Sequence, residues 1–335
     1  MRRRFRIPAS LVAAGLLSLG LAACGDDTEP QSASSSSAPP STADTASPTS
    51  LGAPTTAAAT FPVTIEIAGR QVEIAERPDT IISLSPTATE MLFAIGAGDQ
   101  VEAVDKSSNF PADAPVSDLD GIAPNTEAML GYQPDLVILN FDPSDVTTAM
   151  DAAGVPTITL PTSLTLDDSY AQIKALGDAT GHPGEADALV AQMRSDIEAL
   201  AATVPDRTEP LSYYHELDST LFTVTSNTFV GEIYALAGLA NIADPADADG
   251  AAGGYPQLSA EFLIDADPDL IFLADTKCCA QSAAAVAERP GWSALAAVEA
   301  GNVIELDDDV ASRWGPRVVE FLETIIDAAA VLEQT

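Results

Sequence analysis

The chain of 335 residues carries 50 Asp and Glu against 14 Lys and Arg, which gives a formal net charge of −36. Nucleic acid is excluded as a partner, because phosphate binding needs clustered cationic side chains and an acidic surface repels a polyanion. Hydrophobic residues make up 46% of the chain, so most of it is expected to fold. Its length exceeds the roughly 250 to 300 residues that one core supports, which predicts more than one lobe.

Residues 1–23 have the pattern of an export signal, with four Arg followed by the apolar stretch Ile7–Leu21. That stretch is shorter than the roughly 20 apolar residues of a permanent membrane span. Small residues before Cys24 are typical of a lipoprotein signal, whose cysteine becomes the lipidated first residue; the alternative is a chance cysteine behind an ordinary signal peptide. Cleavage would leave 10 basic and 50 acidic residues, a net charge of −40.

Residues 24–60 are built almost wholly from Ser, Thr, Ala, Pro, Gly and acids, with Leu51 as the only large aliphatic residue. Such a composition buries too little apolar surface to offset the entropy of ordering. We therefore expect a disordered tether, with an r.m.s. span of roughly 30 to 36 Å as a flexible coil.

From Phe61 onward, short apolar runs alternate with helical patterns, which predicts an α/β fold with mainly parallel sheets. The first expected element is a hairpin over Phe61–Ile74 that turns at Ala68-Gly69. Glu185–Val204 has apolar residues at helical spacing and no breaker before Pro205, which predicts one long helix. The other expected strands are Ile81–Leu84, Val101–Val104, Leu136–Leu139, Pro156–Leu160, Leu211–Glu216, Leu221–Thr225, Leu270–Leu273 and Val303–Leu306, and the other expected helices are Thr89–Ile95, Thr126–Gly131, Ser144–Ala153, Phe229–Ala237 and Pro316–Leu332.

An internal repeat divides this folded part. Residues Asn125–Leu139 align without gaps on Ser259–Leu273: each copy has a capping residue, an acid two positions later, an apolar turn, Pro-Asp-Leu and a strand. The economical interpretation is two Rossmann-like lobes, residues 61–182 and 206–335, joined by the long helix over 183–205. The repeat also places Glu127 and Glu261 at equivalent positions. An acid in a first helical turn favours the helix dipole, so a purely structural role for both is the alternative.

Four further segments carry a family resemblance, in the same order along the chain: Arg77–Asp99, Ser108–Asp113, Gly231–Asn241 and Ser312–Arg317. Together with the repeat they resemble the iron-siderophore and cobalamin family of ABC-transporter substrate-binding proteins. The resemblance implies two lobes that hold a ligand between them and a single connecting helix. It also implies docking on a permease through one surface glutamate of each lobe, which match Glu127 and Glu261.

The expected function is therefore that of an extracytoplasmic lipoprotein, anchored by lipid to the outer face of the cell membrane. It captures an iron(III)-siderophore or a related metal chelate or corrinoid and delivers it to an ABC importer. The alternatives are a lipid-anchored sensor or scavenger that has no permease, or a cobalamin or haem binder. We expect a monomer without a cofactor.

Ligand contacts are expected in the loops that follow the carboxyl ends of the strands. Aromatic groups there would stack on a macrocycle or catecholate and Arg313 would meet an anion, although a structural role is the alternative at each position. No Arg or Lys occurs between Lys106 and Lys174, which argues against a strongly anionic ligand. The candidates are Ser85, Thr87, Asn109, Phe110, Phe141, Tyr214, His215, Lys277, Arg313 and Trp314.

Cys278 and Cys279 are adjacent in sequence. Outside the cytoplasm oxidation is favoured, so we expect a vicinal disulfide, with two free thiols or a soft-metal site as alternatives.

Catalytic motifs are missing from the sequence of the folded part. It has neither a Gly-x-Ser-x-Gly elbow nor a Gly-Lys-Ser/Thr loop, and His182 and His215 are its only histidines, too few for a His-rich metal pocket. We expect no catalytic residue and no resident metal. The remaining enzymatic alternative is a distant hydrolase with His215 as its base.

Overall fold

The computed structural model describes residues 60–332. They belong to the second of two units into which the chain divides, Met1–Gly52 and Ala53–Thr335. The predicted signal peptide, Cys24 and nearly all of the predicted tether lie outside the described residues. Within residues 60–332, no helix is both long enough and apolar enough to cross a membrane.

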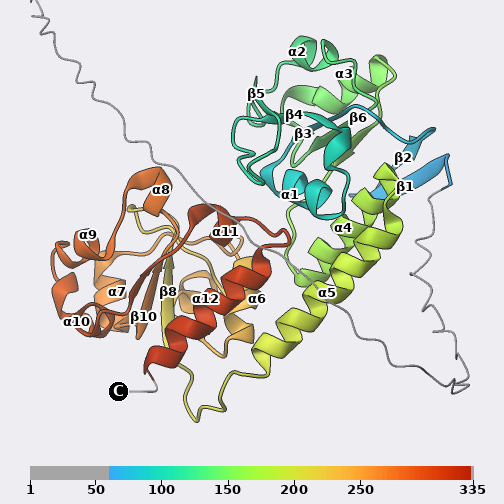
Figure 1. The fold of residues 1–335 in the computed structure, drawn as a ribbon. Helices are drawn as coiled ribbons and strands as arrows, with labels where there is room; N and C mark the ends of the chain where they lie inside the picture. The colour runs from blue at the N-terminus through green and yellow to red at the C-terminus, as the bar shows by residue number, and fades with distance from the viewer. Residues whose placement is uncertain (1–59, 333–335) are drawn as a thin grey trace, which may run out of the picture. The chain divides into compact units, whose positions relative to one another are not determined.

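The N-terminal lobe is built on a five-stranded sheet in which every neighbouring pair is parallel, in the order β5–β4–β3–β6–β7 (Figure 1). Its central strands are buried on both faces, as the mainly apolar sequences Ile81–Leu84 and Leu136–Leu139 require. The predicted hairpin precedes this sheet as an antiparallel pair, with Ala68 and Gly69 at positive φ in its turn. The strands are β1 (Val63–Ile67), β2 (Arg70–Ile74), β3 (Ile81–Leu84), β4 (Val101–Asp105), β5 (Val116–Leu119), β6 (Leu136–Leu139) and β7 (Thr157–Thr159).

The C-terminal lobe has a four-stranded parallel sheet in the order β11–β10–β8–β9. The predicted α/β class with two lobes is thereby confirmed. Its strands are β8 (Ser212–Glu216), β9 (Ala240–Asn241), β10 (Leu270–Leu273) and β11 (Val303–Glu305).

Helices connect the strands of both sheets (Figure 1). They are α1 (Pro86–Ala94), α2 (Thr126–Leu130), α3 (Val146–Ala152), α4 (Leu166–Thr180), α5 (Pro183–Ala201), α6 (Phe229–Leu236), α7 (Ala260–Ala266), α8 (Thr276–Cys279), α9 (Ala283–Ala287), α10 (Ala296–Ala300), α11 (Asp308–Ser312) and α12 (Val318–Val331).

The long helix is present as α5, and it packs on helices of both lobes. On one side it contacts α4, which itself packs on α1 and β1; on the other it contacts α12, which packs on α6. Helix α4 was not predicted, although it begins with a capping box in which Thr165 and Asp168 satisfy each other's backbone amides. Gly177 lets α4 approach α5, because a Cβ at this position would overlap the Cβ of Ala186.

The internal repeat corresponds to equivalent elements of the two lobes. Asn125 caps α2 and Ser259 caps α7, each through a side-chain oxygen that accepts a bond from the third amide of the helix. The aspartate of each Pro-Asp-Leu is equivalent too: Asp135 accepts a bond from the amide of Thr80 at the start of β3, and Asp269 accepts one from Ser212 at the start of β8. Each repeat therefore ties its own strand to the central strand beside it.

One predicted strand is wrong, and several elements have other bounds than predicted; the helix predicted over Thr89–Ile95, for example, runs over Pro86–Ala94. The strand predicted over Leu221–Thr225 is wrong: this segment makes only an isolated bridge between Phe222 and Gln257, because both edges of β8 are already paired, with β9 and β10. The final helix begins at Val318 rather than Pro316, and Arg317 is its N-cap.

Candidate functional site

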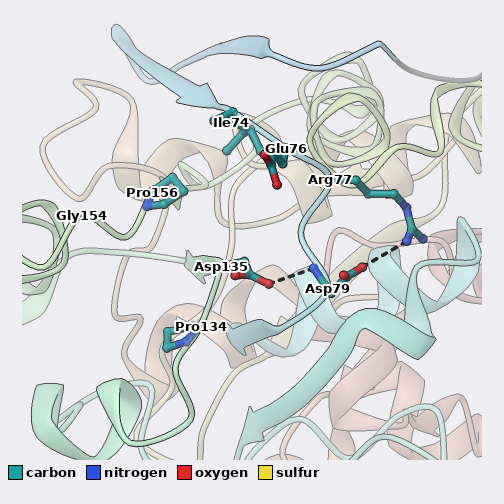
Figure 2. A pocket seen from close by; sticks show the side chains of 9 residues that line it. Ile74, Glu76, Arg77, Asp79, Pro134, Asp135, Gly154 and Pro156 are labelled. Atoms are coloured by element: carbon teal, nitrogen blue, oxygen red, sulfur yellow. Dashed lines mark hydrogen bonds and ion pairs between the residues drawn. The ribbon is translucent and has the colours of Figure 1, made fainter.

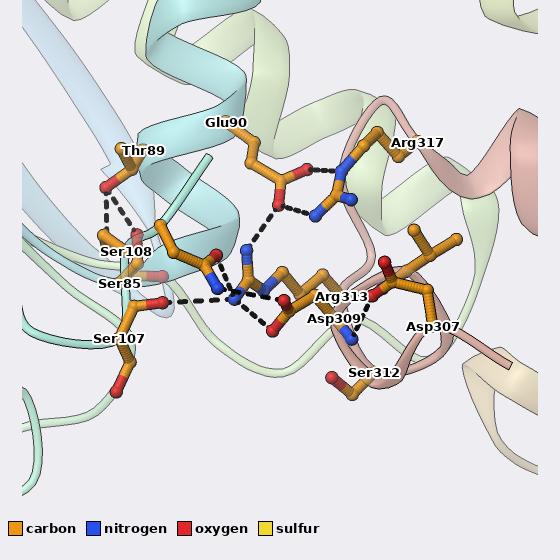
Figure 3. Close-up of polar contacts among 12 residues, drawn as sticks. Ser85, Thr89, Glu90, Ser107, Ser108, Asp307, Asp309, Ser312, Arg313 and Arg317 are labelled. Atoms are coloured by element: carbon orange, nitrogen blue, oxygen red, sulfur yellow. Dashed lines mark hydrogen bonds and ion pairs between the residues drawn. The ribbon is translucent and has the colours of Figure 1, made fainter. Parts of the chain in front are cut away.

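The two lobes meet at a buried ion-pair cluster, made of α1 and the segment between α11 and α12 (Figure 3). Both carboxylate oxygens of Glu90 are engaged: Arg317 donates through Nε to Oε2 at 2.9 Å and through Nη2 to Oε1 at 2.5 Å, and Arg313 donates through Nη1 to Oε1 at 2.8 Å. The Glu90 side chain is 1% exposed, and those of Arg313 and Arg317 are 8% and 13% exposed. Removing Glu90 would leave two nearly buried guanidinium groups short of a counter-charge.

Arg313 extends this cluster toward the loop after β4. Its Nη2 donates to the carbonyl of Ser107 at 3.1 Å, to Oδ1 of Asn109 at 3.0 Å and to Oδ1 of Asp309 at 2.6 Å. Asn109 donates in turn to the other oxygen of Asp309 at 3.0 Å. The guanidinium of Arg317 lies 4.3 Å from the ring centroid of Phe110. Three of the sequence candidates, Asn109, Phe110 and Arg313, are therefore brought together.

A cavity of about 110 Å³ lies beside this cluster, lined from both lobes. Thr162 and Ser163, which follow β7, face a mainly apolar wall that includes Phe229 and Tyr255, and Arg313 and Trp314 complete the lining. Ligand pockets are typically about 300 to 1,000 Å³, so this cavity is smaller than the volume that a bound chelate or corrinoid needs.

Trp314 is held against the N-terminal lobe. Its Nε1 donates to Oε1 of Gln172 in α4 at 3.1 Å, and its carbonyl accepts from the hydroxyl of Ser169. The carboxylate of Glu232 in α6 also accepts a bond from the amide of Leu166 at 2.7 Å. These contacts join the lobes at the first half of α4, beside the second half of α5.

Ser85 and Thr87 are buried at the start of α1, 1% and 5% exposed. Ser85 is the N-cap of this helix, and its Oγ accepts from the amide of Ala88 at 3.2 Å. The hydroxyl of Thr89 joins this group, because its oxygen lies within hydrogen-bond distance of Oγ of Ser83, at 2.9 Å, and of Oγ of Ser108, at 3.1 Å. In this structure, Ser85 therefore shapes the end of α1.

Lys277 and the cysteine pair lie in α8, beside the first turn of α11. Lys277 Nζ donates to Asp307 at 2.6 Å and to Asp309 at 3.0 Å, and the bond to Asp307 raises the pKa of the lysine. The Asp308 carboxylate accepts from the amides of Thr276, Lys277 and Cys278 at 2.8 to 2.9 Å. The structure joins the exposed Cys278 and Cys279 by a disulfide.

Tyr214 and His215 lie inside the core of the C-terminal lobe, and both are 0% exposed. His215 Nδ1 lies 2.8 Å from the hydroxyl of Tyr234, and burial lowers the pKa of the histidine to about 3. Neither side chain is available to a ligand in this structure, because β8 is covered on both faces at these positions. Phe141, by contrast, is 46% exposed after β6.

Two buried acids that are not among the sequence candidates lie at the carboxyl ends of β8 and β10. Glu216 accepts bonds from both terminal nitrogens of Arg289, at 2.6 and 2.5 Å. Asp275 is 0% exposed, and neither of its carboxylate oxygens has a hydrogen-bond partner among the other described residues. Burial, together with the charge of Glu216, raises the pKa of Asp275 to about 7.

A surface hollow at the opposite edge of the first sheet is larger, about 350 Å³, but it has a structural explanation (Figure 2). Its carboxylate, Asp135, accepts bonds from the amides of Asp79 and Thr80 at 3.0 and 2.9 Å and so holds the entry to β3. Arg77 pairs with Asp79 at 3.5 Å. Because ligands of parallel sheets bind beyond the carboxyl ends of the strands, the region between the lobes is the better candidate.

Comparison with protein families matches residues 81–310 to the family described as "Periplasmic binding protein". The chain belongs to that family. Members of the periplasmic binding protein family are solute-binding proteins rather than enzymes, and the family works outside the cytoplasm with ABC transporters. Among residues 60–332, no group of three or more His, Cys, Asp or Glu is placed to hold a metal ion.

Two curated relatives of this periplasmic binding protein are similar over most of their length. The ABC transporter substrate-binding lipoprotein YvrC of Bacillus subtilis is 30% identical over 280 residues, which cover 80% of this chain and 85% of the relative. The cobalamin-binding protein of Halobacterium salinarum is 29% identical over 281 residues, which cover 81% of this chain and 75% of the relative.

Solved structures of periplasmic binding proteins also resemble this chain in fold. The vitamin B12 binding protein BtuF of Vibrio cholerae superposes with a TM-score of 0.63 at 26% identity, covering 77% of this chain and 99% of that one. The heme-binding protein RhuT of Roseiflexus sp. RS-1 superposes with a TM-score of 0.65 at 26% identity, covering 75% of this chain and 99% of that one.

The glutamates of the internal repeat are exposed in the periplasmic binding protein fold. Glu127 lies in the first turn of α2, and Glu261 lies in the first turn of α7. Among the described residues, no hydrogen bond or ion pair holds either carboxylate to another side chain. One exposed carboxylate per lobe is therefore free to meet a partner.

Proposed function

We propose that this protein captures an iron(III)-siderophore, or a related metal chelate or corrinoid, outside the cytoplasm and delivers it to an ABC importer. The observation that carries the proposal is the cavity between the lobes, which Arg313, Trp314 and Tyr255 line with a charged and an aromatic surface. Relatives named for cobalamin and haem support the same class of flat, metal-containing ligand. A cobalamin or haem binder is thus part of this proposal.

Isothermal titration calorimetry of the purified protein tests the ligand class. Cyanocobalamin, haem and a ferric trihydroxamate are the probes, and at least one is expected to bind with a Kd below about 10 µM, which corresponds to roughly 7 kcal/mol. The test variant is Trp314→Phe, which removes the hydrogen bond to Gln172 and makes the side chain in the cavity wall smaller. It is expected to weaken binding of the same probe. If every probe binds more weakly than this limit, the ligand class is refuted.

Docking on the permease is proposed for Glu127 and Glu261. Two exposed carboxylates at equivalent positions of two similar lobes present a symmetric pair of anionic contacts, which suits a pair of cationic side chains on a transporter. The combined variant Glu127→Arg and Glu261→Arg is expected to abolish cellular uptake of the bound chelate while calorimetric affinity stays the same.

The matched control for that experiment is Glu73→Arg with Glu299→Arg. It makes the same charge change at one exposed position of each lobe, away from the repeat. If the docking variant and the control transport equally well, the protein works as a sensor or scavenger without a permease, which is the second candidate function.

Attachment to the membrane by a lipid on Cys24 is likewise proposed, with residues 24–60 as the tether. Support comes from the residues before Cys24 and from the lipoprotein relative. Firm anchoring needs more than one acyl chain, since a single chain binds only marginally. Cys24→Ser is expected to release the protein from the membrane fraction; retention of the variant would refute the anchor. We propose a monomer, which light scattering of the released form tests.

A further inference from the structure

Two arginines of the C-terminal lobe are directed at the space between the lobes, yet neither is free. A single carboxylate from the other lobe, Glu90, binds both of them through bonds of 2.5 to 2.9 Å, and Asp309 binds Arg313 a second time at 2.6 Å. The charges of Glu90 and Asp309 cancel those of Arg313 and Arg317. The cluster as a whole is therefore uncharged (Figure 3).

The other basic side chains near the carboxyl ends of the two sheets also form ion pairs with carboxylates. Lys106 pairs with Asp120, and Lys277 pairs with both Asp307 and Asp309. Asp105, at the end of β4, adds a buried carboxyl group that interacts with Arg313. The described part of the cleft consequently offers an anion no basic side chain without a carboxylate partner.

An anionic chelate would have to displace Glu90 from the arginines to reach them. The displaced carboxylate is 1% exposed and lies in a site where every strong donor to it comes from those same two arginines. A buried carboxylate without a partner is strongly unfavourable, so the exchange is opposed. An uncharged chelate needs no such exchange, because it contacts the cluster with its charges still paired.

We propose that Glu90 determines ligand specificity: it acts as the built-in counter-ion of Arg313 and Arg317, so that the cleft selects uncharged metal chelates over anionic ones. The inference rests on the proposed capture of a metal chelate and deepens it. Glu90 itself positions the two guanidinium groups, and its negative charge lowers the positive potential that they present to a ligand.

The first test compares an uncharged ferric trihydroxamate with a triply anionic ferric tricatecholate on the full-length protein, by calorimetry. The wild type is expected to bind the uncharged chelate at least tenfold more tightly. Glu90→Gln keeps the shape of the side chain and removes its charge, and is expected to shrink this ratio at least tenfold, because the cluster of Arg313, Arg317 and Asp309 then carries one net positive charge. Glu323→Gln, which removes an equal charge from an exposed position of α12, is expected to leave the ratio unchanged.

A second variant is expected to increase the preference for the uncharged chelate over the anionic one. Arg317→Gln leaves Glu90 and Asp309 opposite a single arginine, so the anionic chelate is expected to lose affinity at least threefold relative to the uncharged one. This variant decides the question if circular dichroism shows that Glu90→Gln does not fold. Equal changes for both chelates in every folded variant, or a wild type that prefers the anionic chelate, would overturn the proposal.

A measurement that uses no metal chelate separates this proposal from the proposed function. Citrate without metal is expected to raise the melting temperature of Glu90→Gln saturably and to leave that of the wild type and of Glu323→Gln unchanged. If the wild type binds no chelate but Glu90→Gln gains this response, the transport ligand class fails while the counter-ion role of Glu90 stands. If citrate stabilises all three proteins alike, the counter-ion role is refuted.

Discussion

Asp275 provides a sharp test of the buried electrostatics of the C-terminal lobe. It is 0% exposed at the end of β10 and has no hydrogen-bond partner among the other described residues for either carboxylate oxygen. Burial and the neighbouring Glu216 raise its pKa from 3.8 to about 7, and the guanidinium of Arg289 opposes them. The protonated carboxyl is therefore the form that suits the folded protein up to about neutral pH.

The direction of the pH effect follows from linkage. Because the pKa is higher in the folded protein, Asp275 contributes its full stability below the unfolded pKa of 3.8 and loses that contribution as pH rises through about 7. The slope reaches at most about 1.4 kcal/mol of unfolding free energy per pH unit. Over an interval of about 3 pH units, the upper limit of the loss is about 4 kcal/mol.

Asp275→Asn replaces the carboxyl with a neutral amide of the same shape. Urea unfolding should show the variant and the wild type to be similarly stable near pH 4, and the variant to be more stable by up to about 4 kcal/mol at pH 8. Asp265→Asn is the control, because it removes an exposed carboxylate from α7. A difference between Asp275→Asn and wild type that stays constant from pH 4 to pH 8 would refute the reasoning.

Three further predictions test other parts of the structure. Gly177→Ala should lower the unfolding free energy by about 1 to 3 kcal/mol, because the added methyl group overlaps Ala186 between α4 and α5; an unchanged melting temperature would show that the helices can separate there. Asp308→Ala removes the acceptor of three amides of α8, so this segment should become more susceptible to limited proteolysis, and equal cleavage rates would argue against the cap. In a Cys24→Ser background, maleimide should label Cys278–Cys279 only after a phosphine reductant, whereas labelling of untreated protein would indicate free thiols.

The strands were predictable from sequence where both faces of a sheet are covered. Leu136–Leu139 and Leu270–Leu273 were predicted with the bounds that the structure shows, because a strand buried on both faces needs an unbroken apolar run. The gapless repeat around them carried its own information. The repeat also aligns the aspartates after Pro134 and Pro268, and the structure shows that each accepts a bond from the start of the neighbouring strand.

Segments whose burial depends on other elements were harder to predict. The run Leu221–Thr225 alternates like a strand and is well buried, but it packs as a loop because β8 has no free edge. Helix α4 was missed although Leu166, Tyr170, Ile173 and Leu176 follow a helical period. Some of its polar residues form hydrogen bonds to the other lobe. These bonds join positions more than a hundred residues apart, as between Gln172 and Trp314.

Glu90 shows why the candidate site was only partly predictable. In sequence it is one of 50 acids, and nothing local separates it from an exposed helical glutamate; its partners lie 223 and 227 residues away. The signal that was available lies in the partners. Arg313 and Arg317 stand four residues apart in a segment that resembles the family, and two arginines that enter a buried surface together require an acid there. A search for that acid among the apolar helices of the other lobe leads to α1, where Glu90 is the only charged residue. Pairing of buried charges across lobes is thus the step that sequence patterns alone do not supply, and it is the step on which the ligand preference of this protein is proposed to depend.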